Sequence, residues 1–387
     1  MDSNKHNSRI PQLRFPGFEG EWEEKTFGEL YKKNNIKNDL SYGVDKIISV
    51  ANMYFKTDAN IGDEEYLKSY NVFHLGDIAY EGNKSAYYTY GRFVENTIGD
   101  GIVSHVFDVY SPVSKDHCLG YWKYAINYER IMRPVLEKST IKSTMMTNLI
   151  AKDFLKQKTL VPSPAEQQII ADCLEAEDRM ISAQEQKVES LKAYKKGLMQ
   201  QLFPQPGATT PVLRFPGFTG EWEEKKLGEC FEIGSGRDYK HLSTGDIPVY
   251  GSGGYMCSVN DYLFNGDSAC IGRKGTINNP LLLHGKFWTV DTLFYTFNYI
   301  NTSAYFVYLL FQNIDWMKHN EAGGVPSLSK TIINNISVVL PKPDEQQKIV
   351  ECISSIEDII MNESKKVEIL KNHKTGLMQQ LYPQPVK

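Results

Sequence analysis

The chain of 387 residues lacks most of the sequence patterns that mark a catalytic or metal-binding protein. Its six cysteines, at positions 118, 173, 230, 257, 270 and 352, form no CxxC pair, and its eight histidines form no HExxH motif, so no zinc site is expected. It has no GxxxxGK[ST] phosphate loop and no NPPY, DPPY or glycine-rich adenosylmethionine motif. We therefore expect no active site, and no bound cofactor or metal, in this chain.

Long hydrophobic runs are also missing. No stretch approaches the roughly 20 apolar residues that span a bilayer, and the polar start MDSNKHNSRIPQ has no apolar signal-peptide core. Cysteines without a pairing framework are typical of reduced thiols in the cytosol. The sequence therefore predicts a cytoplasmic protein, long enough for two or three compact domains.

The chain also lacks a strong excess of positive charge. The net charge is −4, whereas a basic domain is expected of a nucleic-acid binder. The acidity is uneven: residues 13–30 hold five glutamates against one lysine and one arginine, while residues 31–160 hold 17 basic against 15 acidic residues. Residues 231–339 hold 7 basic against 8 acidic residues. We expect weak intrinsic affinity for DNA, completed by a partner.

What the sequence does contain is an internal repeat. Residues 13–30, LRFPGFEGEWEEKTFGEL, return at 213–230 as LRFPGFTGEWEEKKLGEC, with 14 of 18 positions identical. PSPAEQQII and GLMQQLFPQP, between 162 and 206, return as PKPDEQQKI and GLMQQLYPQP between 341 and 385. The blocks between the matched parts are almost unrelated in sequence. This contrast indicates a constant scaffold that presents two different recognition surfaces.

Each repeat ends in a predicted long helix. Apolar residues recur at alternating steps of four and three from Ala165 to Leu202, and again from Ile349 to Leu381, which is typical of a coiled-coil seam. Pro164 and Pro343 mark the helix starts, and Pro204 and Pro383 the ends. The seam positions selected from the sequence are Ile170, Leu174, Ile181, Val188, Leu191, Leu198, Ile353, Ile360, Val367, Leu370 and Leu377.

Polar residues inside the seams favour an antiparallel pairing of the two helices over a parallel one. An antiparallel register places Glu177 opposite Lys374, whereas parallel pairing of equivalent positions places Lys195 against Lys374. The same register brings Val188 near Glu363. The remaining alternative is that each helix packs only on its own globular block, which the narrow, long stripe disfavours.

The two variable blocks are predicted to be mixed α/β domains. Short β-prone runs at 46–50, 101–107, 247–250 and 287–290 are separated by Gly, Asn and Asp turns, and aromatic-rich runs at 121–128 and 304–316 are expected to be helices. The domain boundaries follow from this alternation. We expect a first recognition domain at 1–160, a helix at 161–206, a second recognition domain at 207–339 and a helix at 340–387.

One pattern survives between the variable blocks. GDIAYEGNK at 76–84 matches GDSACIGRK at 266–274, so Lys84 and Lys274 occupy equivalent positions. Glycines beside a cation make a tight loop that can approach phosphate closely, although a solvated turn kept for the fold is an equal alternative. The DNA-contacting candidates are Lys84, Arg92, Arg237, Lys240, Arg273, Lys274, Thr276, Ser327, Ser329 and Lys330.

The repeated LRFPGFxGEWEEKxxGE segments, the GDxAxxGxK loops, the SLSKTIINNISVVLPKPDEQQKIV run from Ser327 and the twin GLMQQL helix ends resemble the specificity subunit of type I restriction-modification systems, over residues 10–386. The resemblance implies two target recognition domains that read a split, asymmetric sequence in double-stranded DNA, held by two helices in an antiparallel coiled coil. It implies two methyltransferase (modification) subunits and ATP-driven restriction subunits as partners, which would use S-adenosylmethionine, ATP and Mg.

One departure from the family pattern is that KSTMM at 142–146 lacks the GGVPSLSK form found in the second block. Two other functions were weighed. A coiled-coil adaptor that binds only proteins is favoured by the acidic pI alone. A self-sufficient nuclease is disfavoured, because PDEQQK at 343–348 lies at a helix start and its duplicate carries Ala165 and Ile169 in place of the carboxylate and lysine.

Overall fold

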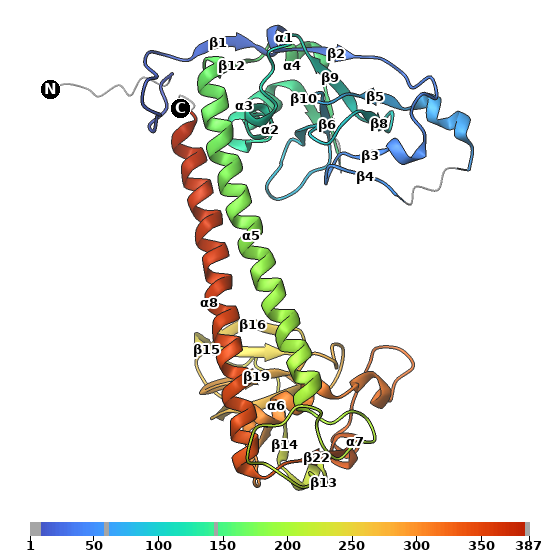
Figure 1. Cartoon of the computed structure of the whole chain (residues 1–387), viewed down its shortest axis with the longest axis vertical. Helices are drawn as coiled ribbons and strands as arrows, with labels where there is room; N and C mark the ends of the chain where they lie inside the picture. Colours follow the sequence, from blue (N-terminus) through green and yellow to red (C-terminus); the bar gives the residue numbers. More distant parts are fainter. Residues whose placement is uncertain (1–8, 58–61, 143–145, 384–387) are drawn as a thin grey trace, which may run out of the picture. The chain divides into compact units, whose positions relative to one another are not determined.

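The computed structural model describes residues 9–57, 62–142 and 146–383, which form two compact units (Figure 1). Unit 1 comprises Met1–Ala183 with Val367–Lys387, and unit 2 comprises Gln184–Lys366. Both boundaries fall inside the two long helices, α5 (Pro164–Leu202) and α8 (Pro343–Leu381), so each unit contains a piece of both. The mixed α/β class and the two long helices predicted from the sequence are confirmed.

Unit 1 is built around a four-stranded antiparallel sheet in the order β2-β9-β6-β7, with two-stranded sheets β1-β12, β3-β4, β5-β8 and β10-β11 around it. Its strands are β1 (Glu23–Thr26), β2 (Tyr31–Asn34), β3 (Ile48–Ser49), β4 (Tyr54–Phe55), β5 (Asn71–Phe73), β6 (Ile78–Glu81), β7 (Arg92–Glu95), β8 (Gly101–Val103), β9 (Asp108–Pro112), β10 (Thr140–Lys142), β11 (Thr147–Leu149) and β12 (Lys158–Val161). Its helices, besides α5 and α8, are α1 (Phe27–Leu30), α2 (Leu119–Ala125), α3 (Glu129–Ser139) and α4 (Ala151–Lys156), with 3-10 turns at Val44–Lys46 and Glu64–Ser69.

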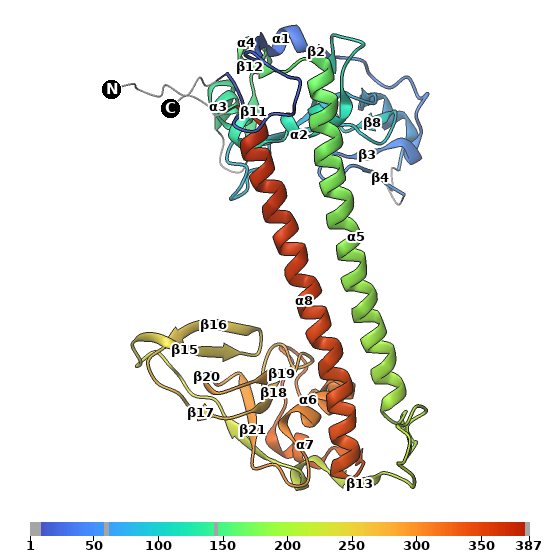
Figure 2. The same ribbon diagram turned by 60° about the vertical axis from the view of Figure 1, so that its left-hand side comes forward.

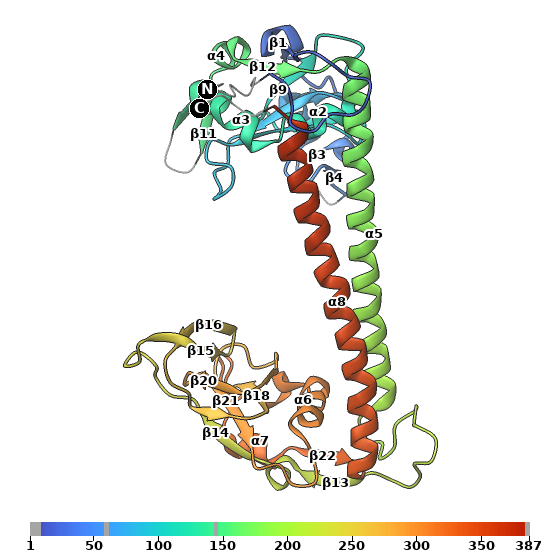
Figure 3. The same ribbon diagram turned by 90° about the vertical axis from the view of Figure 1, so that its left-hand side faces the viewer.

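Unit 2 has two four-stranded sheets, β14-β21-β18-β19 and β16-β15-β20-β17, and the pair β13-β22. Figure 2 and Figure 3 show α6 between the strand β18 and helix α8. The strands are β13 (Glu223–Lys226), β14 (Glu232–Ser235), β15 (Thr244–Gly251), β16 (Gly254–Val259), β17 (Phe264–Asn265), β18 (Ser268–Gly272), β19 (Leu281–Leu283), β20 (Lys286–Thr289), β21 (Leu293–Phe297) and β22 (Ser337–Leu340). The shorter helices are α6 (Ala304–Asn313) and α7 (Lys330–Asn335), with 3-10 turns at Leu227–Glu229 and Trp316–His319.

Each unit contains a four-stranded sheet with the same strand order, although the sequences of the two blocks are almost unrelated. The order β2-β9-β6-β7 in unit 1 matches β14-β21-β18-β19 in unit 2, and every neighbouring pair in both sheets is antiparallel. The two GD motifs directly precede equivalent strands, β6 and β18. The pairs β1-β12 and β13-β22 also share a register, in which Glu23 faces Val161 and Glu223 faces Leu340. The variable blocks are therefore versions of one domain fold.

Buried contacts explain why the segment LRFPGFxGEWEE is kept twice. Arg14 donates two hydrogen bonds of 2.9 Å to the carboxylate of Glu166, at the start of α5, and Arg214 donates bonds of 2.7 and 2.8 Å to Glu345, at the start of α8. The Glu166 and Glu345 side chains are only 2% and 3% exposed. Trp22, which is 2% exposed, donates its indole N–H to Glu166 over 3.3 Å. The repeated segment thus attaches each domain to its long helix through a desolvated ion pair.

Within each unit the segments of α5 and α8 pack against each other in opposite directions. In unit 1, Ile170 and Leu174 from the start of α5 share a buried cluster with Leu377 and Leu381 from the end of α8. In unit 2, Leu198 and Leu202 share a cluster with Ile353. All eleven seam positions predicted from the sequence are buried or half-buried, as an apolar stripe between paired helices requires.

At the predicted opposition of Glu177 and Lys374, each of the two side chains pairs with a neighbour of the other. Lys374 donates instead to Asp178 over 2.5 Å, and Glu177 lies 3.3 Å from the Nδ1 atom of His373. Neighbouring positions on a helix point about 100° apart, so a rotation of a fraction of a turn selects one acid rather than the other. Lys374 of α8 therefore still pairs with an acid of α5, as the antiparallel arrangement predicts, but the acid is Asp178.

The polar residues in the seam of unit 2 are satisfied by hydrogen bonds. Glu363, which is 8% exposed, accepts a bond of 2.6 Å from Gln184 and pairs with Lys187 at 3.0 Å and Lys366 at 2.9 Å. These bonds lower the pKa of Glu363 to about 2, the bond from Gln184 most of all. Lys195 pairs with Glu357, which also accepts a hydrogen bond from Tyr305 of α6. Glu363 therefore stays charged at neutral pH.

Most expected short elements exist, with different bounds. The run at 247–250 lies inside β15 and that at 287–290 overlaps β20, whereas the run at 46–50 yields only the two-residue strand β3 because Lys46 ends a 3-10 turn. All six cysteines are free. In the part of the chain that the structure describes, no helix combines the length and apolarity needed to cross a bilayer.

Candidate nucleic-acid interface

In unit 2 a hollow of about 590 Å³ brings together half of the DNA-contacting candidates. Three cations and one acid, Asp291, lie on its lining, so its electrostatic character is basic although the domain as a whole is not. The predicted residues on its lining are Arg273, Lys274, Ser327, Ser329 and Lys330; the lining also includes Ser235, Asp291, Thr292, Phe294 and Leu328.

The loop that carries Arg273 and Lys274 is held from both sides. Leu328 donates its backbone N–H to the carbonyl of Arg273 over 2.9 Å, and Gly275 donates to Pro326 over 2.8 Å. A Cβ atom at Gly272 would lie 2.0 Å from the carbonyl oxygen of Thr276, so only glycine fits there. The loop is therefore a fixed platform rather than a loose turn, and the glycine spacing has a steric reason.

The three cations of the hollow differ in how far they are already engaged. Lys330 donates to the carbonyl of Ile233 over 2.7 Å and lies 5.9 Å from the Phe294 ring centroid. Arg273 makes a long contact of 3.4 Å to the Asp291 carbonyl and lies 6.0 Å from the Phe294 ring centroid. Lys274 is exposed, and within residues 9–57, 62–142 and 146–383 its ammonium has no hydrogen bond or ion pair. Lys274 is thus the cation of the hollow best placed to bind an anion.

The two serines of the hollow that were predicted from the sequence, Ser327 and Ser329, also hold the local structure. The Ser329 hydroxyl accepts a bond from the amide of Ile332 over 3.3 Å and caps α7, as helix N-cap residues do. Ser327 pairs with Lys274 in an isolated β-bridge and donates its amide to Asn320 over 2.9 Å. The cap fixes the point at which Lys330 enters the hollow.

Three other candidates in unit 2, Arg237, Lys240 and Thr276, do not line this hollow. Their side chains are exposed. The backbone of Arg237 is anchored, because its amide donates to Thr289 over 2.8 Å and its carbonyl accepts from the Trp288 indole over 2.8 Å. Arg237 therefore leaves the end of β14 from a fixed position, two residues beyond Ser235 of the hollow.

Unit 1 holds the equivalent loop in a similar way. Asn83 forms an isolated β-bridge with Met146, and Thr147 donates its amide to Gly82 over 2.8 Å. A Cβ atom at Gly82 would lie 2.2 Å from the carbonyl oxygen of Thr147. The departure noted at 142–146 thus ends in a residue that pairs with this loop, although residues 143–145 lie outside the described part of the chain. Lys84 follows directly and is partly exposed.

Arg92, at the start of β7, is held on three sides. It pairs with Glu81 of β6 at 2.7 Å, donates to the carbonyl of Ala51 over 3.0 Å and lies 5.1 Å from the Tyr88 ring centroid. Glu81 and Arg92 are direct partners in the β6-β7 ladder. Arg92 is thus oriented by a carboxylate and an aromatic ring, the arrangement that prepares a guanidinium for planar recognition.

A second hollow, which lies in unit 1, was not predicted from the sequence. It measures about 920 Å³ and lies at the start of β6, the end opposite to the Lys84 loop; Lys32, Lys33, Lys115 and His74 contribute basic groups to its lining. Asp77 of the GD motif also lines it, and burial raises the pKa of that carboxyl. Sequence patterns could not reveal this hollow, because its residues come from three separate segments of the chain, at 32–36, 74–77 and 111–119.

A buried acid and imidazole lie beneath this second hollow. His117 Nε2 is 2.7 Å from Glu95, whose side chain is fully buried. Burial raises the pKa of Glu95 to about 9 and lowers that of His117 to about 4, because a low dielectric disfavours charge. At neutral pH we interpret the contact as a hydrogen bond from a protonated carboxyl to a neutral imidazole, not as an ion pair.

Among the described residues, no group of three or more His, Cys, Asp or Glu side chains is arranged to hold a metal ion. The arrangement therefore offers cations, hydroxyls and fixed backbone groups on two related loops. Such groups can position a polyanion and contact base edges.

Comparisons with known proteins agree with this arrangement. Residues 219–371 match a family model described as a type I restriction modification DNA specificity domain. The type I restriction enzyme MjaVIII specificity subunit of Methanocaldococcus jannaschii is 24% identical over 284 residues, which are 62% of this chain and 65% of that protein. The alignment therefore spans slightly less than two thirds of this relative.

Two solved structures share the fold. The S subunit of a type I restriction-modification system from M. genitalium superposes with a TM-score of 0.57 and 17% identity, over 97% of this chain and 100% of that one. A chain from a study of complex assembly and conformational transition in the type I system gives a TM-score of 0.60 and 14% identity, with the same coverage. Residues 219–371 thus carry a type I restriction modification DNA specificity domain, and the fold of nearly the whole chain is similar to that of solved chains from type I restriction-modification systems.

Proposed function

We propose that this chain is the DNA sequence-specificity subunit of a type I restriction-modification complex. It recognises a bipartite, asymmetric target in double-stranded DNA and directs methylation and restriction by its partners. The observation that carries the proposal is the pair of equivalent loops, Gly82 to Lys84 and Gly272 to Gly275, each held by backbone bonds at the end of an equivalent strand. One fold with two different loop sequences is what a reader of two unlike half-sites requires.

The proposed division of the chain follows the repeat. Residues 1–160 and 207–339 are the two recognition domains, and residues 161–206 and 340–387 are the helices that pair as an antiparallel coiled coil. The ion pair of Lys374 with Asp178 in unit 1 and the bond of Gln184 to Glu363 in unit 2 support the pairing. Heptad spacing and opposed charges set such a register.

The proposed mechanism separates anchoring from reading. Lys84, Lys274 and Arg273 anchor phosphates, while Arg92, oriented by Glu81, is the best prepared of the candidates for a bidentate contact. Chemistry is supplied by partners: two methyltransferase subunits using S-adenosylmethionine, and restriction subunits using ATP and Mg. This chain itself holds no cofactor and works in the cytoplasm.

Genome-wide methylation mapping tests the proposal. A host that carries the chain with its neighbouring methyltransferase subunit is compared with the same host lacking the chain. A new split motif of two short, unlike half-sites with a fixed gap is the expected result. If the assembled complex forms and no chain-dependent motif arises, the protein-only adaptor is favoured instead.

A matched variant makes the test sharper. The double substitution Arg273→Ala and Lys274→Ala leaves Gly272 and Gly275 in place, so the loop keeps its backbone bonds. Methylation at the whole motif is expected to fall, because phosphate anchoring in one domain is required at every site. Loss of only one half of the motif, with relaxed sequence there, would instead assign base reading to these two residues.

A further inference from the structure

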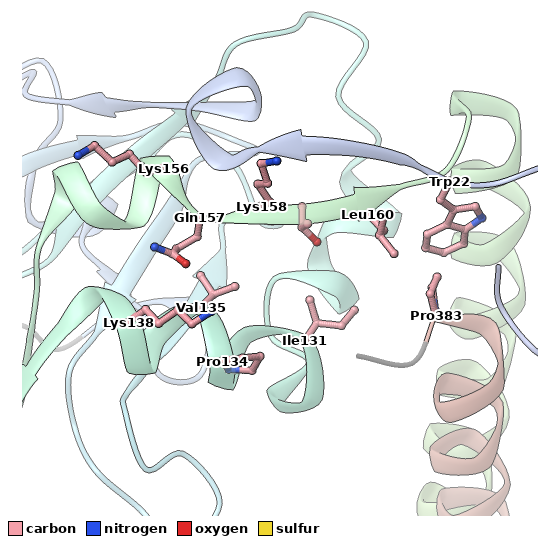
Figure 4. Close-up of a pocket in the computed structure, with 11 residues that line it drawn as sticks. Trp22, Ile131, Pro134, Val135, Lys138, Lys156, Gln157, Lys158, Leu160 and Pro383 are labelled. Atoms are coloured by element: carbon pink, nitrogen blue, oxygen red, sulfur yellow. The ribbon is translucent and has the colours of Figure 1, made fainter. Parts of the chain in front are cut away.

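Unit 1 also contains a hollow that is separate from the two basic hollows described above and has no role in the proposed function. It measures about 360 Å³ and lies between α3 and β12 (Figure 4). Figure 4 shows Ile131 of α3 facing Leu160 of β12 and Val135 facing Gln157, with Trp22 and Pro383 at one end. Its volume lies in the range of sites that hold a ligand or an inserted side chain.

The rim of this hollow is basic. Lys138 at the end of α3 and Lys156 at the end of α4 are exposed, and neither ammonium has a hydrogen bond or ion pair among the described residues. Lys158, the third lysine of the lining, is different because it pairs with Glu24 at 2.7 Å. An apolar floor with two unengaged cations at one edge is suited to an apolar group that has negative charge beside it.

Unit 2 has no equivalent of the lysine and glutamine that lie beside this hollow, so the shared fold does not require them. The pairs β1-β12 and β13-β22 share their register, and α4 and α7 have the same length, so Lys156 corresponds to Asn335 and Gln157 to Ile336. Ile336 is 8% exposed, whereas Gln157 lies on the lining of the hollow. At this position unit 2 has a buried apolar side chain, while unit 1 keeps a polar residue beside a hollow.

We propose that the hollow between α3 and β12 receives an apolar or aromatic side chain from a segment of a partner protein, flanked by acidic residues that face Lys138 and Lys156. The apolar floor favours a protein partner over duplex DNA, because a phosphodiester backbone has no apolar group to insert between Ile131 and Leu160. Insertion of one large anchor into a desolvated pocket is the usual source of affinity in such contacts.

The test uses the full-length chain and a defined probe. A fluorescein-labelled peptide with one tryptophan flanked on each side by two glutamates is titrated, and its anisotropy is recorded. Two comparison peptides replace the tryptophan by alanine or the glutamates by lysine. The protein variants are Lys138→Gln with Lys156→Asn, the second being the residue that unit 2 has at that position. Lys152→Asn, an exposed charge on α4 that does not line the hollow, is the control.

Saturable binding of the acidic tryptophan peptide is expected, and the double variant should weaken it about fivefold, the effect of removing two surface charges. The Lys152 variant should bind as the wild type does, and both comparison peptides should bind more weakly. A benzophenone in place of the peptide's tryptophan should cross-link to α3 or β12. Absence of saturable binding, equal affinity of the double variant, or cross-links elsewhere would overturn the proposal.

Duplex DNA supplies the deciding comparison. If the double variant weakens binding of a 30-base-pair duplex and leaves peptide binding unchanged, the two lysines are phosphate anchors and the proposal is wrong. If peptide binding falls and duplex binding stays within twofold of wild type, the hollow is a protein-docking site. Because the methylation test of the proposed function does not involve this hollow, the two can fail separately.

Discussion

Replacing Glu166 by glutamine should remove much of the stability of unit 1. The Glu166 side chain is 2% exposed, and Arg14, which donates two bonds of 2.9 Å to it, is 16% exposed. The amide leaves the guanidinium without its charge partner in a desolvated site. Removing one partner of a buried pair costs about 3–5 kcal/mol, which for a unit of this size lowers the melting temperature by about 6–20 °C.

Two matched variants give the scale of this loss. Glu345→Gln breaks the equivalent pair with Arg214 and should cost a similar amount, because that carboxylate is 3% exposed. Glu24→Gln breaks the pair with Lys158, whose side chains are 36% and 61% exposed. An exposed pair contributes little to stability because solvent screens it, so this variant should melt close to the wild type.

Differential scanning calorimetry of the full chain measures the three variants. A double variant, Arg14→Met with Glu166→Leu, should recover most of the loss, because it removes both charges and fills the space with apolar groups. If Glu166→Gln melts no lower than Glu24→Gln, the ion pair does not stabilise the attachment of the domain to α5. The repeated arginine and glutamate would then need a reason other than stability.

Three further outcomes are expected. Lys274→Ala should weaken binding of the assembled complex to all duplexes and lower the slope of log K against log salt by about 1, measured by fluorescence titration. Gly272→Ala should cost about 1–3 kcal/mol in urea unfolding, since its Cβ would lie 2.0 Å from a carbonyl oxygen, whereas Gly253→Ala meets no atom within 4 Å and should be mild. Glu95→Gln should flatten the pH dependence of stability. The raised pKa of Glu95, about 9, gives stability that is complete below about pH 4.5 and lost as pH rises toward 9.

The long helices could be predicted from the sequence because their signal is periodic. An apolar repeat of 3.5 residues extends over many turns, so single polar residues do not hide it. The structure places the starts of α5 and α8 within a residue of those expected. The choice of Asp178 rather than Glu177 as the partner of Lys374 could not be predicted. That choice depends on tertiary contacts, such as the hydrogen bond of 2.5 Å that Tyr124 donates to Asp178.

The common strand order of the two four-stranded sheets could not be predicted from the sequence either. Strand positions inside a sheet accept any apolar residue of suitable shape, so β6, IAYE, and β18, SACIG, keep the same place with little identity. The glycine before each loop, in contrast, is fixed by a steric limit, at Gly82 and Gly272. The repeated glycine was therefore visible in the sequence, whereas the strands that lead to it were not.

Candidate site residues were predicted by type, and the structure separates them by engagement. Lys330 is bound to a backbone carbonyl and Arg92 to a carboxylate, whereas Lys274 has no such partner among the described residues. Residue type carries no information about these partners, because Ile233 and Glu81 come from other strands. Phe294 and Asp291 of the hollow were missed for the same reason.

Under the proposed function, the difference between paired and unpaired cations explains why the domains have a low net charge. A cation that is already paired, such as Arg92 with Glu81, adds little to binding at a random site, because part of its charge is neutralised. It is nevertheless held in one orientation, so a base edge that matches it gains a contact without further ordering cost. Pairing therefore lowers non-specific affinity more than specific affinity. Specificity is the ratio of the two, and a recognition domain with few unengaged cations increases it.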